Sequence, residues 1–278
     1  MDIPLDFAAT QVVAFMFVIA RLSGLFLIAP VFSSPQIPGR IKVMMLFVLG
    51  ATLAPIVSSG STKIPTDIVG MIASIASEAL VGLALGFAVS IVFSAIQVAA
   101  SLIDTSIGFS MATIIDPLNN AQGAVLGSFY SIVGTLAFLS VQGHHWLLAG
   151  FKRSYDTVPL GTAPDVEAML HNLFATFGQL FGMAFQIAAP VLVSLLLVDV
   201  VLGIVSRVVP QMNVFFVGIP VKIGVGLVAI IITLPSFTGF LEHRVSDILA
   251  GASVVAGTAD EEPATTAAAP SPSDGSGR

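Results

Sequence analysis

The sequence predicts an all-α membrane protein built from long helices. Hydrophobic residues make up 56% of its 278 residues, and charged residues make up only 9%. An average soluble domain carries roughly 25% charged residues, so this chain has too few of them to cover a water-exposed surface. Its apolar runs are long and do not alternate with polar residues, which indicates helices rather than strands.

Composition excludes several classes of function. The formal net charge is −6, but four acidic residues lie in the C-terminal tail, and no basic patch indicates nucleic-acid binding. Cysteine is absent, which excludes disulfides, thiolate catalysis and iron–sulfur ligation. Asp2 and Asp6 stand where a signal peptide is positive, and the apolar run 7–28 is too long for one. We therefore expect this run to be an uncleaved first span.

Six apolar stretches are predicted to form a membrane-embedded helical domain, residues 1–250. Pro30, Pro35 and Pro38 predict a rigid, non-helical connector after the first stretch. Residues 251–278 are rich in Ala, Pro, Ser, Thr, Gly and acidic residues, so this tail is predicted to be disordered. The stretches lie at about 7–29, 41–58, 68–100, 124–141, 169–209 and 214–235.

Two of these stretches are longer than a membrane is thick. Residues 68–100 contain no proline and one charge, Glu78. A continuous helix of this length would span roughly 50 Å against a hydrocarbon core of about 30 Å, so it must tilt steeply or extend beyond the lipid. Residues 169–209 contain Pro190, which predicts two helical arms meeting near residues 188–190, because proline kinks a helix.

Small residues recur at intervals of four along the third stretch, which predicts a helix-packing face. Because Glu78 lies on this face, we expect its carboxyl group to face protein rather than lipid. An ionisable residue so placed is either functional or the partner of a structural hydrogen bond. The members of the face are Ser74, Glu78, Gly82, Gly86, Ser90 and Ser94.

The break between the last two apolar stretches concentrates polar and helix-breaking residues. Two prolines in this motif are predicted to interrupt the helix. Backbone groups left unpaired in hydrocarbon cost several kcal/mol each, so such a break requires protein or water around it. It is either an ordinary loop between two spans or a buried or channel-facing hairpin within a larger assembly. Its residues are Arg207, Pro210, Gln211, Asn213, Phe215, Gly218, Pro220 and Lys222.

The segment 107–123 has the composition of a loop that seals a pore. Flexible apolar side chains adapt to a narrow opening, and an Asp-Pro pair ends a helix because proline disfavours the helical conformation before it. An ordinary helix end would contain similar residues, so the pattern alone leaves both interpretations open. The candidate gate residues are Gly108, Phe109, Met111, Ile114, Asp116 and Pro117.

No residue pattern predicts enzyme chemistry, a metal site or a cofactor. Asp104, Asp116 and Asp199 lack the Gly-x-Gly-Asp motif that is common in intramembrane aspartyl proteases. The adjacent histidines in Gly143–Trp146 point to different helix faces and lack a His-Glu-x-x-His pattern. We therefore interpret Gly143–Trp146 as an interfacial turn.

Taken in order, the motifs of this chain resemble those of the FliR family, which is related to the SctT export-gate subunits of injectisomes. The resemblance spans about residues 7–245, and its last motif is more similar to the flagellar branch. Ala100 and Asp104 stand where the family would have glycines. The matching motifs are Arg21-x-x-Gly24, Ala29-Pro30 with Phe32, Ile37-Pro38-x-Arg40, Glu78 with Gly82 and Gly86, Gly108, Asp116-Pro117, Gly143-His144, Pro159-x-Gly161, Ala189-Pro190, Pro210-Gln211-Met212-Asn213-Val214-Phe215 and Gly218-x-Pro220-x-Lys222.

The resemblance implies a non-enzymatic subunit of the flagellar type III export gate. Such a subunit joins FliP-like and FliQ-like membrane proteins in a spiral hetero-oligomer, beside FlhB-like and FlhA-like export proteins. It passes unfolded proteins across the bacterial inner membrane at the flagellar basal body. Its helices pack into a cone that sits largely outside the bilayer, and its plug loop corresponds to about residues 108–123.

A secondary transporter is the alternative that the residues leave open. In that case Glu78, Asp199, Arg207 and the broken helix would bind substrate and ions. An inverted repeat would favour this interpretation, and none is visible in the sequence. Stable association with two other small membrane proteins would favour the export gate instead.

Overall fold

The computed structural model describes residues 5–58, 67–108, 125–211 and 213–250. These residues form helices, and no strand occurs among them. Judged by length and composition, five of the described helices can cross a membrane, or six spans result if one bent helix pair counts as a single span. The prediction of an all-α membrane protein is therefore confirmed.

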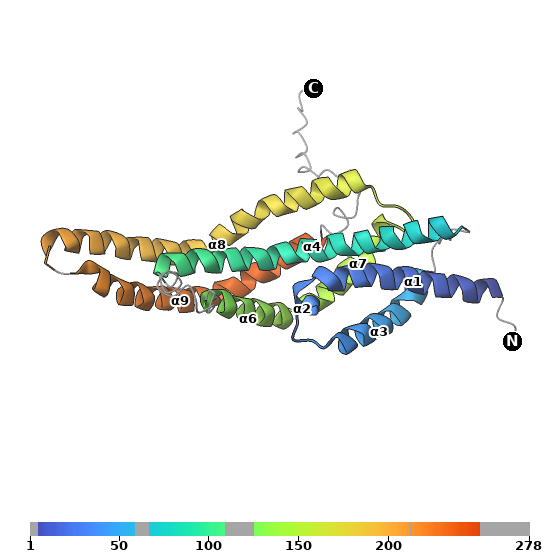
Figure 1. The fold of residues 1–278 in the computed structure, drawn as a ribbon, viewed down its shortest axis with the longest axis horizontal. Coiled ribbons are helices and arrows are strands. Elements are labelled where there is room, and N and C mark those ends of the chain that lie inside the picture. The colour runs from blue at the N-terminus through green and yellow to red at the C-terminus, as the bar shows by residue number, and fades with distance from the viewer. Residues whose placement is uncertain (1–4, 59–66, 109–124, 212, 251–278) are drawn as a thin grey trace, which may run out of the picture.

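The first helices form a hairpin with a short turn of helix at its corner (Figure 1). α1 (Leu5–Ile28) packs against α3 (Gly39–Val57), and α2 (Pro30–Ser33) lies between them in the chain. The predicted non-helical connector was therefore wrong for its first four residues. Proline is tolerated at the first position of a helix, where its missing N–H would be unpaired in any case. Only residues 34–38 remain non-helical.

The longest element of the first half, α4 (Ile68–Ile107), runs through the centre of the molecule, and α1, α6, α8 and α9 all pack against it. Its 40 residues correspond to about 60 Å, so the predicted overlong third helix is confirmed. It begins at Asp67, whose carboxylate accepts a hydrogen bond of 2.8 Å from the Gly70 N–H. It ends at Gly108, whose φ of 101° is a left-handed conformation that glycine adopts readily.

The next two helices, α6 (Val125–Ser140) and α7 (Gly143–Thr157), are bent by 68° relative to each other. The apolar stretch of α6 was predicted, but α7 was not. The turn expected at Gly143–Trp146 was wrong, because these residues form the first turn of α7. This helix carries histidines and charged residues that interrupt any apolar run, so its pattern did not indicate a span.

The last two helices, α8 (Val166–Val208) and α9 (Val214–Ala250), form a long hairpin that extends beyond the end of α4 (Figure 1). α8 bends near Pro190, as predicted, although the helix remains continuous there. α9 continues through Pro220, so the break predicted at this residue was wrong. Proline's fixed φ suits a helix, and its cost is one backbone hydrogen bond together with a kink.

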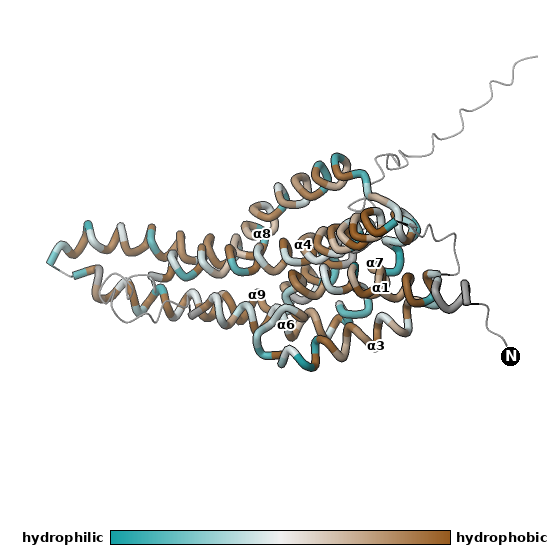
Figure 2. Tube along the Cα trace, turned by 45° about the vertical axis from the view of Figure 1, so that its right-hand side comes forward, coloured by the Kyte–Doolittle hydropathy of each residue, from teal (hydrophilic) through white to brown (hydrophobic). Residues whose placement is uncertain are grey.

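Burial differs sharply between the centre of the molecule and the hairpin. In the most apolar part of α4, 67% of the residues are buried. In the most apolar parts of α8 and of α9, the buried share is only 17% each. Figure 2 shows apolar residues along much of the hairpin. This surface must be covered by lipid or by other proteins, because so large an exposed apolar patch marks an interaction surface.

Candidate functional site

A buried ion pair joins the first and the central helix. Arg21 lies on α1 and Glu78 on α4, and 2.6 Å separate Arg21 Nε from Glu78 Oε2. Neither side chain is exposed at all. Two opposite charges in apolar segments stabilise each other only where hydrogen bonds also satisfy their remaining polar atoms.

The other guanidinium nitrogens of Arg21 bind α7 and the residue after it. Arg21 Nη1 donates to Ser154 Oγ at 2.9 Å, and Nη2 donates to the Val158 carbonyl oxygen at 3.0 Å. The guanidinium carbon also lies 3.8 Å from the centre of the Tyr155 ring, a distance at which the cation and the aromatic face attract each other. Each of the three nitrogens therefore has a partner.

The second carboxylate oxygen of Glu78 binds the connector between α7 and α8. Glu78 Oε1 accepts a hydrogen bond of 2.9 Å from the Gly161 N–H. Gly161 has a φ of 77°, a left-handed conformation that residues with a Cβ rarely adopt. Glu78 therefore ties three segments together: α1 through Arg21, its own helix α4, and the connector.

Glycines allow α1 and α4 to cross at this point. A Cβ at Gly82 would overlap the carbonyl group of Arg21, and one at Gly24 would overlap the backbone of Ala79. A Cβ at Gly86 would lie 2.9 Å from the Leu25 carbonyl oxygen. Gly82 and Gly86, two members of the predicted packing face, therefore lie against another helix of the same chain.

The C-terminal members of the predicted face lie elsewhere. Ser90 and Ser94 line a cleft of about 670 Å³ between α4, α6 and the connector after α1. The lining carries several uncharged polar side chains beside apolar ones. The Ser90 hydroxyl donates to the Phe87 carbonyl oxygen within α4 at 2.8 Å. The polar residues of this cleft are Ser33, Ser34, Gln36, Ser90, Ser94, Gln97, Ser131 and Thr135.

The broken-helix motif forms the turn of the α8–α9 hairpin and the start of α9. Arg207, the last basic residue of α8, is exposed, as are Pro210, Gln211 and Asn213 around the turn. Phe215 and Pro220 lie in α9, and the backbone of Gly218 packs close to Leu202 of α8. Lys222 Nζ lies 2.5 Å from Asp199 Oδ1, so an ion pair links the two helices.

Large apolar side chains cover the outer part of this hairpin. Many are more than half exposed, and few charges lie among them. A surface of this kind is stable only in contact with lipid or protein. The most exposed of these residues are Val193, Leu196, Leu197, Val200, Val201, Ile204, Val208, Phe216, Val228, Ile231 and Ile232.

Of the candidate gate residues, Gly108 is the C-terminal cap of α4. The described residues on either side of the gate segment lie near each other: the backbone of Leu126, at the start of α6, approaches the Asp104 carboxylate. α9 also approaches here, since a Cβ at Gly226 would lie 2.6 Å from a carbon of Ile107. The gate residues Phe109, Met111, Ile114, Asp116 and Pro117 lie outside the described residues.

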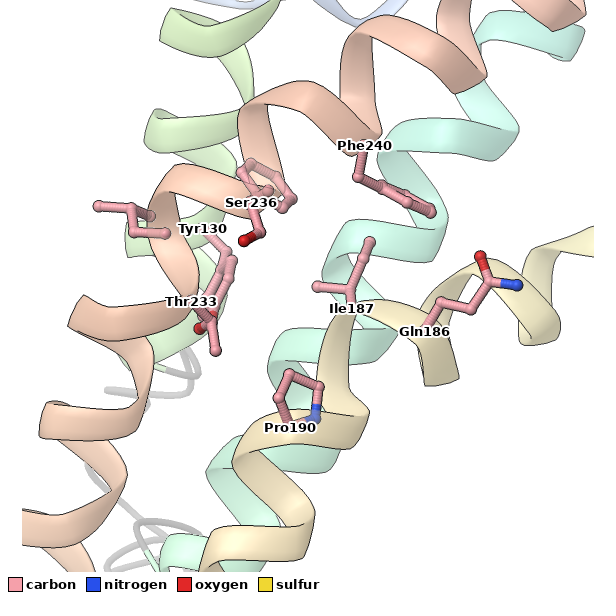
Figure 3. A pocket seen from close by; sticks show the side chains of 9 residues that line it. Tyr130, Gln186, Ile187, Pro190, Thr233, Ser236 and Phe240 are labelled. Atoms are coloured by element: carbon pink, nitrogen blue, oxygen red, sulfur yellow. The ribbon is translucent and has the colours of Figure 1, made fainter.

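A cavity lies beside the bend of α8 (Figure 3). It has a volume of about 370 Å³ and is lined by residues of α6, α8 and α9, including Pro190 and Gln186. Arg244 of α9 donates to the Gln186 side-chain oxygen at 3.0 Å. The polar lining residues Tyr130, Thr233 and Ser236 appear in Figure 3 on the helices opposite the bend.

The structure does not bring together the residues of the transporter or the protease hypothesis. Glu78 belongs to the α1–α4 pair, whereas Asp199 pairs with Lys222 on the hairpin. Asp104 lies near the backbone at the start of α6, and Asp116 lies outside the described residues. Within the described ranges, no three His, Asp or Glu side chains are close enough to hold a metal ion.

Sequence reasoning missed three members of the buried network. Arg21 and Glu78 were both singled out, but their pairing was not predicted, because 57 residues separate them. The available signal was their isolation: each is the one charged residue of its apolar run, and such residues pair with one another inside a membrane protein. Ser154, Tyr155 and the Val158 carbonyl gave no comparable signal, and Gly161 was noted only as part of the Pro159-x-Gly161 motif.

Comparison with known proteins identifies the family. The family described as bacterial export proteins, family 1, matches residues 12–248. The chain is 38% identical over 227 residues to the flagellar biosynthetic protein FliR of Bacillus subtilis, covering 80% of this chain and 86% of the relative. It is 29% identical over 234 residues to FliR of Pectobacterium carotovorum, covering 84% of this chain and 89% of that protein.

A relative with another name also matches. The surface presentation of antigens protein SpaR of Shigella flexneri is 29% identical over 203 residues, covering 73% of this chain and 77% of SpaR. The resemblance to the FliR family is confirmed by these matches. The chain belongs to the bacterial export proteins, family 1.

Proposed function

We propose that this chain is a structural pore and gating subunit of the flagellar type III protein-export apparatus. In this role it passes unfolded flagellar proteins across the bacterial inner membrane at the flagellar basal body. The observation that carries the proposal is the family match over residues 12–248, since its relatives include flagellar biosynthetic FliR proteins. The role is one of assembly and gating, without enzymatic activity.

The partners in this proposal are FliP-like and FliQ-like membrane subunits, with FlhB-like and FlhA-like export proteins nearby. The length of the helices supports an assembly. α8 has 43 residues, or about 65 Å, which is roughly twice the hydrocarbon thickness. Lipid covers only part of such a helix, so the remaining apolar surface of the hairpin requires other proteins.

The proposed gate is the segment from Gly108 to Pro117, with Phe109, Met111 and Ile114 as the side chains that fill the pore. Asp116 and Pro117 would allow the segment to swing, because proline disfavours a helical conformation in the residue before it. Its supporting feature is the proximity of the Asp104 carboxylate to the Leu126 backbone, because the two described ends of the segment therefore lie near each other. A segment anchored at both ends is suited to reach across a narrow opening.

The domain organisation in this proposal has two parts. Residues 1–250 form the export-gate domain, and residues 251–278 form a tail that takes no part in folding. The buried network of Arg21 and Glu78, the glycine-mediated crossing of α1 and α4, and the broken-helix motif then all belong to the first part. Their role is to hold the pore wall in one shape.

Co-purification in mild detergent tests the proposed function. The tagged chain should retain FliP-like and FliQ-like subunits in a stable complex when all three are co-expressed. The variant Val200→Arg places a charge in the exposed apolar surface of the hairpin, so the tagged chain should then retain less of the FliP-like and FliQ-like subunits. Recovery of the wild-type chain alone, or as a homo-oligomer, would contradict the proposal and favour a transporter.

A further inference from the structure

The N-terminal arm of α8, residues 166–187, stands away from the central helix at its start. Figures 1 and 2 both show the arm rising from α4 on the side of the bend that leads to the connector. Near its beginning, Met169 forms a small buried cluster with Ala84 and Ala88 of α4, which is separate from the main core. Few buried contacts therefore fix this end of the arm.

An apolar cleft lies between this arm and α4. Its volume is about 490 Å³, and every lining residue is apolar, with Leu83 and Phe87 on one wall and Leu173 and Phe177 on the other. Close packing of the two walls would gain van der Waals contacts that the open cleft lacks. We therefore attribute the separation to the attachments of the arm, which are its start and its buried part around Leu180, Met183 and Ala184.

The attachment at the start of the arm is the connector held by the buried ion pair. The connector bonds through its Val158 carbonyl to Arg21 and through its Gly161 N–H to Glu78. A further bond of 3.1 Å, from the Thr162 N–H to the Pro159 carbonyl oxygen, closes a tight turn in it. α8 then begins after Asp165, whose side chain caps its first turn. Gly161, the hydrogen-bond partner of Glu78 in the connector, therefore lies only a few residues before the start of the arm.

We propose that Glu78 is a positioning residue for the N-terminal arm of α8. With one oxygen on Arg21 and the other on the Gly161 N–H, it fixes where the arm starts and keeps the cleft open. By fixing the start of the arm, Glu78 sets the direction in which the arm presents its exposed phenylalanines to neighbouring subunits. This consequence rests on the proposed function. The phenylalanines are Phe174, Phe181 and Phe185, which are 71%, 56% and 55% exposed.

Distance measurements between spin labels test this role in the full-length chain, purified without partners. The chain contains no cysteine, so labels are placed at will. One pair, Leu80→Cys with Phe174→Cys, reports across the cleft. A reference pair, Val12→Cys with Val43→Cys, reports the packing of α1 on α3. All four residues are exposed, which permits labelling with little disturbance of the core.

The decisive variant is the double substitution Arg21→Met and Glu78→Leu. Replacing a buried ion pair with apolar residues of similar size commonly preserves the fold. The exchange removes both bonds that hold the connector: the acceptor of the Gly161 N–H and the donor to the Val158 carbonyl. We expect the reference distance to stay as in the wild type, while the distance across the cleft becomes shorter and its distribution broader. Ser154→Ala, which leaves Glu78 bonded to Gly161, should change neither distance.

Two results would overturn the role of Glu78. The first is a double variant that keeps both wild-type distances, because the arm would then hold its place without the carboxylate. The second is a Ser154→Ala variant that shifts the cleft distance as much as the double variant does. Because no partner subunit is present, failure here leaves the co-purification result, and thus the proposed function, untouched.

Discussion

Arg21 on α1 and Glu78 on α4 meet in a fully buried ion pair, with 2.6 Å between Arg21 Nε and Glu78 Oε2. The same two side chains also bind Ser154, the Val158 carbonyl and the Gly161 N–H. Local sequence cannot form such a network, since its members come from α1, α4, α7 and a connector. Because these segments share one network, the packing of the N-terminal half is cooperative: the loss of one member weakens the contacts of the others.

Removal of one charge of this pair should be severely destabilising. Glu78→Ala leaves Arg21 buried and unpaired, so we expect the free energy of unfolding to fall by about 3–5 kcal/mol. Thermal unfolding in detergent, followed by the fluorescence of the one tryptophan, Trp146 in α7, measures the change. Glu242→Ala, at an exposed position of α9, is the control and should shift stability by at most about 0.5 kcal/mol. Equal stability of the two variants would refute this assignment.

The crossing of α1 and α4 should tolerate no side chain at Gly82. A Cβ there would overlap the Arg21 carbonyl group, and overpacking of a core costs about 1–3 kcal/mol or more. We expect Gly82→Ala to lower the melting temperature and Gly86→Leu to prevent assembly, whereas Phe87→Leu should be milder. Gly178→Ala is the matched control, because nothing lies within 4 Å of a Cβ at this helical position.

A Gly82→Ala variant as stable as Gly178→Ala would show that the two helices do not cross as closely as described. The control itself should be neutral or slightly stabilising, since alanine is favoured over glycine within a helix by about 0.5–1 kcal/mol. Gly82→Ala should therefore lower the melting temperature, whereas Gly178→Ala should leave it unchanged or raise it slightly. The sign of the change distinguishes the two positions as well as its size.

The ion pair of the hairpin should depend on opposite charges rather than on residue identity. Lys222 and Asp199 lie on facing helices with 2.5 Å between Nζ and Oδ1. Asp199→Lys places two positive charges side by side and should reduce membrane levels of the chain and recovery of its partners. The exchange Asp199→Lys with Lys222→Asp should restore both, as measured by immunoblotting and co-purification. If the exchange is as defective as the single change, the pair does not act through its charge.

The tail should be dispensable for folding. Residues 258–278 are mostly small, polar or acidic and offer little apolar surface for docking. Deletion of Thr258 to Arg278 should leave the melting temperature and the amount of purified complex unchanged. Loss of the complex with a normally folded chain would identify the tail as a binding segment instead.

Elements that depend on one continuous apolar run were predictable from the sequence. α4 contains no proline, and most of it was predicted: the expected stretch 68–100 falls short of the observed end at Ile107. The bend of α8 followed from Pro190, because the effect of proline on a helix is local. The α8–α9 turn likewise followed from Pro210 and its polar neighbours.

Features that depend on distant contacts or on weak patterns were not predictable. α7 combines His144, Lys152 and Arg153 with apolar residues, so neither its length nor its hydropathy indicated a span. Pro220 was taken as a helix breaker, but a proline inside a helix can cost a backbone hydrogen bond and a kink without ending the helix. The pairing of Glu78 with Arg21 was not predicted, because it is set by how α1 crosses α4. Its one signal was the isolation of each charge in an apolar run.

The central claim, that this chain is a gating subunit of a pore, is tested most directly by ion conductance. The chain is co-expressed with its FliP-like and FliQ-like partners, and conductance or growth inhibition is measured for wild type, for Met111→Gly and for a shortened 109–120 segment. A pore wide enough for an unfolded chain leaks ions unless apolar side chains fill it, so both variants should assemble normally and leak more than wild type. A shortened segment that assembles and remains as tight as wild type would contradict the account and place the seal on the partner subunits.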